Sequence, residues 1–342
     1  MSAPSSAIAA AVMRAWRRRG PLACLLWPLS LLFALAAAVR RALYRAGWLA
    51  AVRLPVPVIV VGNVYVGGTG KTPLVIWLVQ ALAAAGHRPG VVSRGYGASA
   101  GAPRPASAGV AQAGDEPVLI AARGGCPVMV GRDRPAAARA LLAAHPGIDV
   151  IVADDGLQHY PLARDIEIVL FDERGAGNGW LLPAGPLREP ASRRRDFTVL
   201  NAADGALPPG IGAAPYRMRL AGTVAERLID PAQKMPLAGI AASARVLAAA
   251  GIGNPARFFT MLRAAGLKFV EMPLPDHYPF SDDPFAGDPA EVILITEKDA
   301  VKCRRHPSLR HDPRLWVVPV TAQIDGALAQ QILEKLRGHP TA

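Results

Sequence analysis

The sequence predicts an α/β protein with a helix-covered parallel sheet domain, a second, smaller α/β domain and an apolar helix at its N-terminal end. Three observations support this fold class. Short β-branched runs alternate with apolar stretches of helical length, and strands that alternate with crossovers form parallel sheets. A second series of the same kind begins near residue 245. The chain has 342 residues, a usual length for two domains.

Composition excludes several classes of protein. Hydrophobic residues make up 51% of the chain and charged residues 19%, so the sequence can bury a large core and is not disordered. Cys24, Cys126 and Cys303 have neither metal-ligand spacing nor a disulfide framework. The net charge of +12 suits either nucleic acid or an anionic membrane as a partner.

Most of that charge lies in an N-terminal arm, residues 1–53. Residues 20–39 of the arm are uncharged and largely apolar, long enough to span a bilayer as a helix. The arm contains no lysine and no acidic residue, and it carries eight arginines, namely Arg14, Arg17, Arg18, Arg19, Arg40, Arg41, Arg45 and Arg53.

Four structures are compatible with residues 20–39. A spanning helix has the right length, but basic residues at both ends give no clear orientation, and Pro28 weakens a straight helix. A cleaved signal peptide would share the basic start and the small residues near 36–38. A buried core helix would need partners for eight arginines. An interfacial helix fits the flanking arginines, so we expect a membrane-associated arm of undetermined depth.

The first folded domain is expected over residues 54–206. Its first strand, 56–62, ends in glycine and leads through a loop into a helix that runs to about residue 85. Pro73 suits the first turn of that helix. Further helices are expected near 115–124 and 133–145. The remaining strands are expected at 90–93, 127–130, 148–153, 166–171 and 197–200.

A loosely patterned segment rich in proline and glycine, 207–237, is interpreted as a connector. The smaller C-terminal domain then covers 238–342. It is expected to contain strands at 245–250, 268–272, 291–296 and 315–320, a helix that ends near 265, and a closing helix at 326–337.

The loop after the first strand has the composition of a phosphate-binding loop. Glycines let backbone N–H groups approach phosphate oxygens at a helix N-terminus, which makes the first domain resemble a P-loop NTPase. A purely structural turn would not explain a Lys-Thr pair at the helix start. Tyr65 stands where the strict motif has its first glycine. The expected nucleotide-binding residues are Gly67, Gly68, Thr69, Gly70, Lys71 and Thr72.

Two acidic residues end the apolar strand at 148–153. In a P-loop protein an acid at this place approaches Mg²⁺, so Asp154 and Asp155 are candidate metal ligands together with the Thr72 hydroxyl. A strand that ends in Asp-Asp-Gly is otherwise an ordinary turn. Gln158 and His159 follow, either as substrate contacts or as caps of the loop.

Three further residues have both a catalytic and an ordinary interpretation. Asp115 heads an expected helix, where it is either an N-terminal cap or the general base for a hydroxyl acceptor. His277 lies in a Pro-Asp-His-Tyr loop and could tune such a base. Arg188, in a proline-rich segment, could stabilise a transferring phosphoryl group.

Taken together, the motifs resemble the tetraacyldisaccharide 4′-kinase family. They occur in the family's order from about residue 54 to 320, and the basic apolar arm is similar to that family's membrane-associated helix. After DDGLQH the chain continues with Tyr160 and Pro161, less basic than the family pattern. The matching pieces are GNVYVGGTGKTP (62–73), SRGYG (93–97), GDEP (114–117), DDGLQH (154–159), LPAGPLREP (182–190), AGIGNP (250–255), PDH (275–277) and TEKDAVK (296–302).

The resemblance implies transfer of the γ-phosphate of ATP, with Mg²⁺, to the 4′-hydroxyl of a tetraacyldisaccharide 1-phosphate, which yields lipid IV-A. It further implies Asp115 as the base supported by His277, Lys71 as phosphate ligand and Arg188 as a phosphoryl contact. The resemblance places the protein at the cytoplasmic face of the bacterial inner membrane, where the arm is expected to contact anionic lipids. It implies no obligate protein partner.

Two other classes remain as alternatives. A membrane-associated P-loop switch ATPase of the partitioning type also uses Gly-Gly-x-Gly-Lys-Thr, but it normally has a lysine where Val66 stands. A nucleic-acid-binding protein would carry basic and aromatic residues over its folded body, whereas here the charge excess lies in the arm. We therefore expect no nucleic-acid partner.

Overall fold

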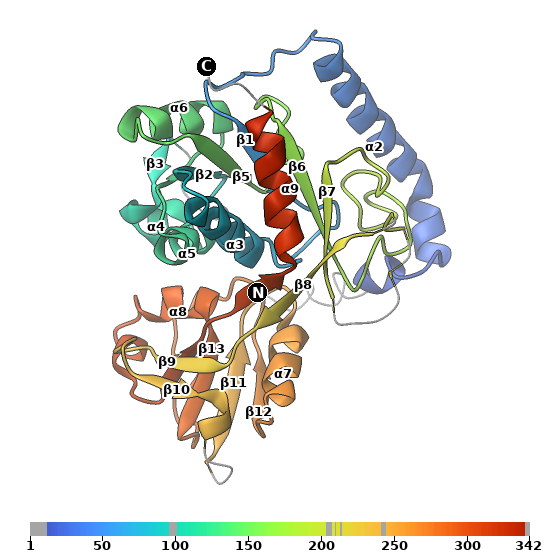
Figure 1. Cartoon of the computed structure of the whole chain (residues 1–342). Helices are drawn as coiled ribbons and strands as arrows, with labels where there is room; N and C mark the ends of the chain where they lie inside the picture. The colour runs from blue at the N-terminus through green and yellow to red at the C-terminus, as the bar shows by residue number, and fades with distance from the viewer. Residues whose placement is uncertain are drawn as a thin grey trace.

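The computed structural model describes residues 12–338, except 96–100, 203–206, 209, 213 and 241–243. The first eleven residues of the arm, Tyr96 and Gly97 of the SRGYG motif, and residues 203–206 at the expected domain boundary lie outside the described residues. Two sheets form two domains, one above the other in Figure 1. The predicted fold class is confirmed, and the predicted domain boundaries differ in two respects described below.

The larger domain contains a nine-stranded sheet that is mostly parallel. Its central strand is β1 (Val58–Gly62), flanked on both sides by parallel strands, and only β3 and β15 run antiparallel to their neighbours. In spatial order the strands are β15 (Thr321–Ile324), β8 (Tyr216–Ala221), β7 (Phe197–Asn201), β6 (Ile166–Asp172), β1, β5 (Val150–Asp154), β2 (Pro89–Ser93), β4 (Val128–Val130) and β3 (Arg104–Pro105).

Helices cover both faces of this sheet because its strands are apolar on both sides. On one face Ile59 and Val61 of β1 share a core with α3 (Lys71–Ala84), α5 (Asp115–Gly124) and α9 (Gly326–Arg337). On the other face Val58 and Val60 join a core with α6 (Arg134–Ala144) and long loops. A short helix, α4 (Val110–Ala113), precedes α5.

The smaller domain contains a six-stranded sheet. Four parallel strands carry α7 (Pro255–Ala264) and α8 (Glu297–Cys303), and two antiparallel strands extend the edge. The strand order is β10 (Lys234–Pro236), β9 (Val224–Arg227), β14 (Leu315–Val318), β13 (Val292–Thr296), β11 (Val246–Ala250) and β12 (Val270–Pro273).

The expected connector at 207–237 contains strands of both sheets. Its strand β8 is the last parallel strand of the large sheet, and its strands β9 and β10 belong to the small sheet. Most residues of β8 are only partly buried and one is exposed, so the strand lacks the continuous apolar run of a buried parallel strand and its sequence signal is weak.

The C-terminal segment returns to the larger domain, in contrast to the expected single domain over 238–342. Strand β15 pairs with β8, and Leu328, Ile332 and Leu336 of α9 belong to the same core as Leu74 and Leu78 of α3. The smaller domain is therefore an insertion between β8 and β15, and Figure 1 shows α9 beside the first strands of the chain.

The N-terminal helix α2 (Pro21–Arg45) lies along the larger domain. The Trp16 Nε1–H, just before it, donates to the Pro183 carbonyl at 3.0 Å, and the Ser30 hydroxyl donates to the Leu181 carbonyl at 2.7 Å. Near its end the rings of Tyr44 and Tyr160 lie 5.7 Å apart. The helix is thus attached to the body along its whole length.

The opposite face of α2 is apolar and exposed. Leu25, Leu32 and Leu35 are 76%, 64% and 62% exposed. Among the described residues α2 alone is long and apolar enough to cross a membrane. Its contacts with the larger domain, however, occur from the start of the helix to its end. This geometry suits a helix that lies in the plane of an interface.

Candidate active site

The phosphate-binding loop joins β1 to α3 and depends on glycine at two positions. Gly67 and Gly70 have φ of +100° and +96°, a backbone region that glycine adopts without strain. A Cβ on Gly70 would lie 2.5 Å from Nδ2 of Asn201, which donates to the Thr69 carbonyl at 2.9 Å. Residues 67–70 therefore form the turn before α3, and Lys71 and Thr72 are the first two residues of the helix.

Asn63, at the end of β1, holds this loop from inside. Its Nδ2 donates to the carbonyls of Tyr65 and Gly67, and its Oδ1 accepts from Lys71 Nζ at 3.1 Å. The side chain is fully buried. The sequence analysis did not assign Asn63, although an asparagine between an apolar strand and a glycine-rich loop was a usable signal.

Lys71, Asp155 and Arg188 form one charged cluster. Lys71 Nζ lies 3.5 Å from Asp155 Oδ1, and Arg188 Nη1 lies 3.4 Å from Asp155 Oδ2. Burial acts to raise the pKa of Asp155, but the charges of Lys71, Arg188 and neighbouring Arg134 outweigh it and lower the pKa. This carboxylate is ionised and paired.

Asp154 has the opposite environment. It is 2% exposed, and its Oδ2 accepts from the Ser93 hydroxyl at 3.0 Å. Burial, followed by the negative charges of Glu116 and Asp155, raises its pKa to about 6. Its buried Oδ1 has no hydrogen-bond partner among the described residues. An orphaned carboxylate oxygen among acidic neighbours suits a cation, as do the oxygen ligands that Mg²⁺ prefers.

Asp115 and His277 come from different domains. Asp115 is the first residue of α5 and is 5% exposed. Its Oδ2 lies 3.4 Å from His277 Nδ1 and 3.4 Å from Lys302 Nζ of α8. Burial opposes ionisation of Asp115, but His277, Lys298 and Lys302 hold its pKa well below the usual range. Interaction with Asp115 in turn raises the pKa of His277.

A second pair also crosses the domain boundary. Glu116 follows Asp115 and forms an ion pair with Lys298 of α8. Lys298 lowers the pKa of Glu116, and burial acts against this effect. The sequence analysis matched the motifs of these residues without assigning them roles, because a contact between domains leaves no local pattern.

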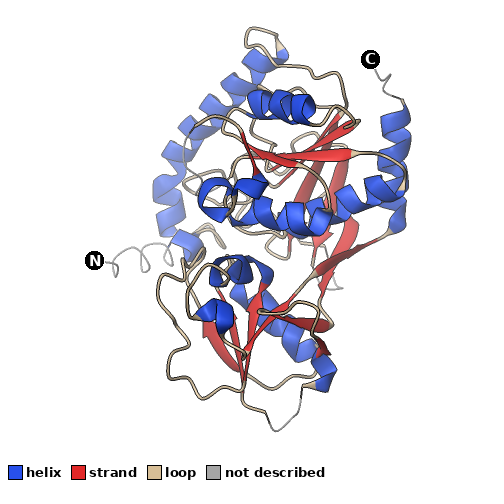
Figure 2. Cartoon of the chain, turned by 90° about the vertical axis from the view of Figure 1, so that its left-hand side faces the viewer, coloured by secondary structure: helices blue, strands red, loops and turns tan. Residues whose placement is uncertain are grey.

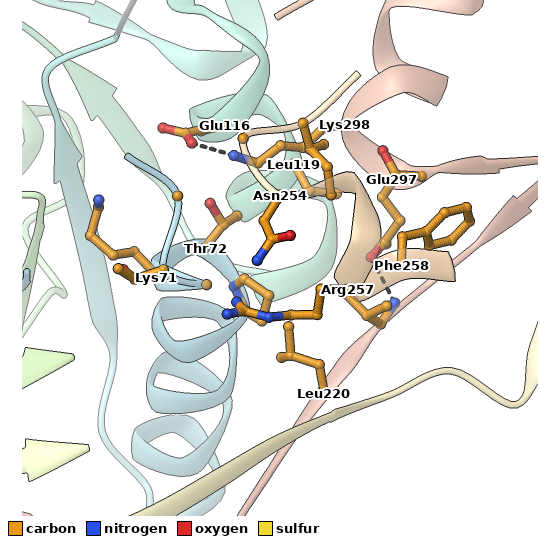
Figure 3. Close-up of a pocket in the computed structure, with 18 of the residues that line it drawn as sticks. Lys71, Thr72, Glu116, Leu119, Leu220, Asn254, Arg257, Phe258, Glu297 and Lys298 are labelled. Atoms are coloured by element: carbon orange, nitrogen blue, oxygen red, sulfur yellow. Dashed lines mark hydrogen bonds and ion pairs between the residues drawn. The ribbon is translucent and has the colours of Figure 1, made fainter. Parts of the chain in front are cut away.

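A pocket lies between the phosphate-binding loop and the smaller domain. Figure 3 shows Thr72, Asn254 and Arg257 around its centre, with Phe258 and Leu220 on its apolar side. Gly253 approaches closely, since a Cβ on it would lie 3.3 Å from the Gly68 nitrogen. Apolar walls beside a phosphate loop suit the base and ribose of a nucleotide.

Arg134 lies beside Asp154 and Asp155, and its charge also acts on His159. Arg134 donates to the carbonyls of Asp154 and Asp155 at 3.1 and 2.8 Å. Burial, followed by the charges of Arg134 and Arg164, lowers the pKa of His159 to about 4. His159 is therefore neutral at pH 7, and its buried Nε2 has no hydrogen-bond partner among the described residues.

The fold and this arrangement define a P-loop phosphotransferase with a pocket between its two domains. Residues 22–337 match the family described as tetraacyldisaccharide-1-P 4′-kinase. The chain belongs to this family.

Similar proteins support the assignment over nearly the whole chain. The tetraacyldisaccharide 4′-kinases of Janthinobacterium sp. (strain Marseille) and Herminiimonas arsenicoxydans are 61% and 62% identical, each over 96% of both chains. A crystal structure of LpxK from Aquifex aeolicus in complex with ATP has a TM-score of 0.76 and 29% identity, over 92% of this chain and 99% of that one.

Proposed function

We propose that the protein transfers the γ-phosphate of ATP to the 4′-hydroxyl of a tetraacyldisaccharide 1-phosphate, giving lipid IV-A. Family membership supports this activity, and the ATP complex of the Aquifex aeolicus relative supports the nucleotide. The observation that carries the proposal is the Asp115–His277 pair beside a phosphate-binding loop. A base and a phosphate cradle at one site are what transfer to a hydroxyl requires.

Each residue then has a role. Asp115 accepts the proton of the attacking hydroxyl, and His277 orients the carboxylate and passes the proton onward. Lys71 leaves Asp155 and binds the β- and γ-phosphate oxygens, while Arg188 stabilises charge on the transferring group. The apolar pocket wall near Phe258 holds the adenine.

Mg²⁺ would be held by the Thr72 hydroxyl and Asp154, with Asp155 beside them. The free Oδ1 of Asp154 supports this choice. When bound, the ion neutralises charge on the β- and γ-phosphates. Asp154 would bind the ion as a carboxylate, and burial raises its pKa to about 6, so we expect magnesium affinity to fall below that pH.

The lipid substrate places the enzyme at a membrane surface. We propose that α2 lies in the interface on the cytoplasmic face of the inner membrane, with its leucine face among the lipids. A spanning orientation would pull Ser30 and Tyr44 away from their body contacts. Neither nucleic acid nor an obligate protein partner is part of this proposal.

The test is transfer of radiolabelled phosphate from ATP to purified tetraacyldisaccharide 1-phosphate, with the product assigned by mass spectrometry. A 4′-phosphorylated product supports the proposal. ATP hydrolysis that needs no lipid acceptor but is stimulated by DNA or a protein would favour the partitioning-type switch ATPase instead.

A further inference from the structure

A basin far from the nucleotide pocket lies where α2 ends. It is an open hollow of about 1550 Å³ between the end of α2, the chain before β1, and the segments that precede β6 and β7. These segments meet the sheet at the amino ends of its strands, whereas the phosphate-binding loop leaves the carboxyl end of β1. The seven residues of β6 separate the two edges by roughly 20 Å.

The basin is strongly basic. Seven arginines line it against four acidic residues, which are Asp165, Glu167, Glu189 and Asp196. The arginines are Arg41, Arg45, Arg53, Arg164, Arg193, Arg194 and Arg195.

Several arginines of the basin are paired with acidic residues of the protein. Arg193 pairs with Glu167 and Glu189 at 2.6 and 3.0 Å, and Arg41 lies 3.5 Å from Glu189. Arg53 pairs with Asp165 at 2.8 Å. The buried Nε of Arg193 has no hydrogen-bond partner among the described residues.

Two arginines at the rim are different. Arg45, at the end of α2, and Arg194, before β7, are exposed, and the described residues offer neither of them a hydrogen bond or an ion pair. They come from segments far apart in sequence and line the same hollow. A guanidinium presents a planar set of donors that matches phosphate oxygens.

The surroundings indicate where such a phosphate would come from. Trp48, just after α2, is 80% exposed, and Val39 on α2 is 49% exposed. Exposed tryptophan and aliphatic side chains beside arginines are typical of a surface at the head-group level of a bilayer. The basin thus opens beside the proposed membrane-contacting face.

We propose that this basin binds the phosphate of an anionic membrane phospholipid, with Arg45 and Arg194 as its ligands. The inference rests on the proposed membrane association of α2 and adds to it a defined head-group site. A lipid held there fixes the height of the larger domain at the bilayer, while the opposite edge of the sheet carries the kinase chemistry.

The test uses the full-length protein and two probes. Binding to phosphatidylcholine vesicles, with and without 20% phosphatidylglycerol, measures membrane association. Titration with monomeric dihexanoyl phosphatidylglycerol, compared with inorganic phosphate, measures occupancy of the site. The variants are R45Q/R194Q, the charge-conserving R45K/R194K, and R139Q/R310Q, which removes two exposed arginines elsewhere.

The site predicts saturable binding of the short-chain lipid that R45Q/R194Q weakens at least tenfold and R45K/R194K weakens severalfold, while R139Q/R310Q binds like wild type. Binding to pure phosphatidylcholine stays unchanged in all variants. If R45K/R194K binds the short-chain lipid as well as wild type does, the basin attracts anions by its overall charge and is not a defined site. If the protein binds inorganic phosphate tightly but not the lipid, the ligand of the basin is a soluble anion. If the wild-type protein binds no vesicles, the membrane association itself fails.

Discussion

Asp115 and His277, which belong to different domains, are joined by an Oδ2 to Nδ1 distance of 3.4 Å. Each residue changes the protonation of the other, since His277 helps hold Asp115 ionised and Asp115 raises the pKa of His277. The proposed base is therefore complete only when the two domains meet.

Replacement of Asp115 by Asn is expected to lower kcat by at least a hundredfold, because the attacking hydroxyl loses its proton acceptor. ATP affinity should change little, since Asp115 is not among the residues that line the proposed nucleotide pocket. Steady-state kinetics with nucleotide binding by calorimetry checks both parts. An unchanged kcat would make Asp115 a helix cap only.

The pKa of His277 offers a direct measure of the same pair. We expect a value above 6.5 by NMR titration, falling toward 6.5 in Asp115→Asn. A raised histidine pKa stabilises the fold fully below pH 6.5, and that contribution is lost as pH rises through the folded value. The free energy of unfolding should thus fall across this window in wild type and less in the variant. Identical pH profiles of unfolding in wild type and variant would show that Asp115 does not influence the titration of His277.

Lys71→Ala is expected to reduce phosphoryl transfer by roughly a thousandfold, because its ammonium group would bind the β- and γ-phosphates. It should also remove the partner of Asp155. The measurement is radiolabelled transfer, with circular dichroism to verify folding. Lys268→Ala, an exposed lysine of the smaller domain, serves as control. Near-normal turnover of the Lys71 variant would refute the phosphate-binding assignment.

Gly70→Ala tests the loop itself. Its added Cβ would meet Asn201 Nδ2 at 2.5 Å, so the loop must shift and KM for ATP is expected to rise at least tenfold. Gly86→Ala is a matched control, because Gly86 has a similar φ of +91° but open space around its Cβ position. It should cost about 1 kcal/mol of stability and leave KM unchanged. Equal KM values in the two variants would contradict the geometry.

The exposed face of α2 can be tested without removing the helix. Leu25→Glu with Leu32→Glu places two charges on that face, and we expect membrane fractionation to find the protein released. Activity on detergent-dispersed substrate should persist, because the packed face stays intact. Val270→Glu, at a similarly exposed position in the smaller domain, is the control. Continued membrane binding of the double variant would show that the protein contacts lipid through another surface.

Local signals explain which elements the sequence predicts well. The helix at 115–124 starts after Gly114 and is capped by Gly125, and the helix at 326–337 has Asp325 as its N-cap. Strands such as β8 and β15 are short and half-exposed, and their partners are distant in sequence. Their assignment depends on tertiary pairing that no local pattern contains.

The same distinction applies to the site. The phosphate-binding loop and the Asp154–Asp155 pair follow from residue types at strand ends, and the structure brings Lys71 and Arg188 to Asp155. The Glu116–Lys298 contact depends on how two domains face each other. Such contacts cannot be read from spacing along the chain.

The return of β15 and α9 to the larger domain has a consequence for biosynthesis. On the ribosome, the nucleotide-binding sheet emerges first but lacks an edge strand, and its α3 face lacks the cover of α9. The inserted smaller domain can complete its own sheet before residues 321–337 are made. We therefore expect the part of the protein that is translated earliest to be the last to finish folding, and to be open to proteases and chaperones until then.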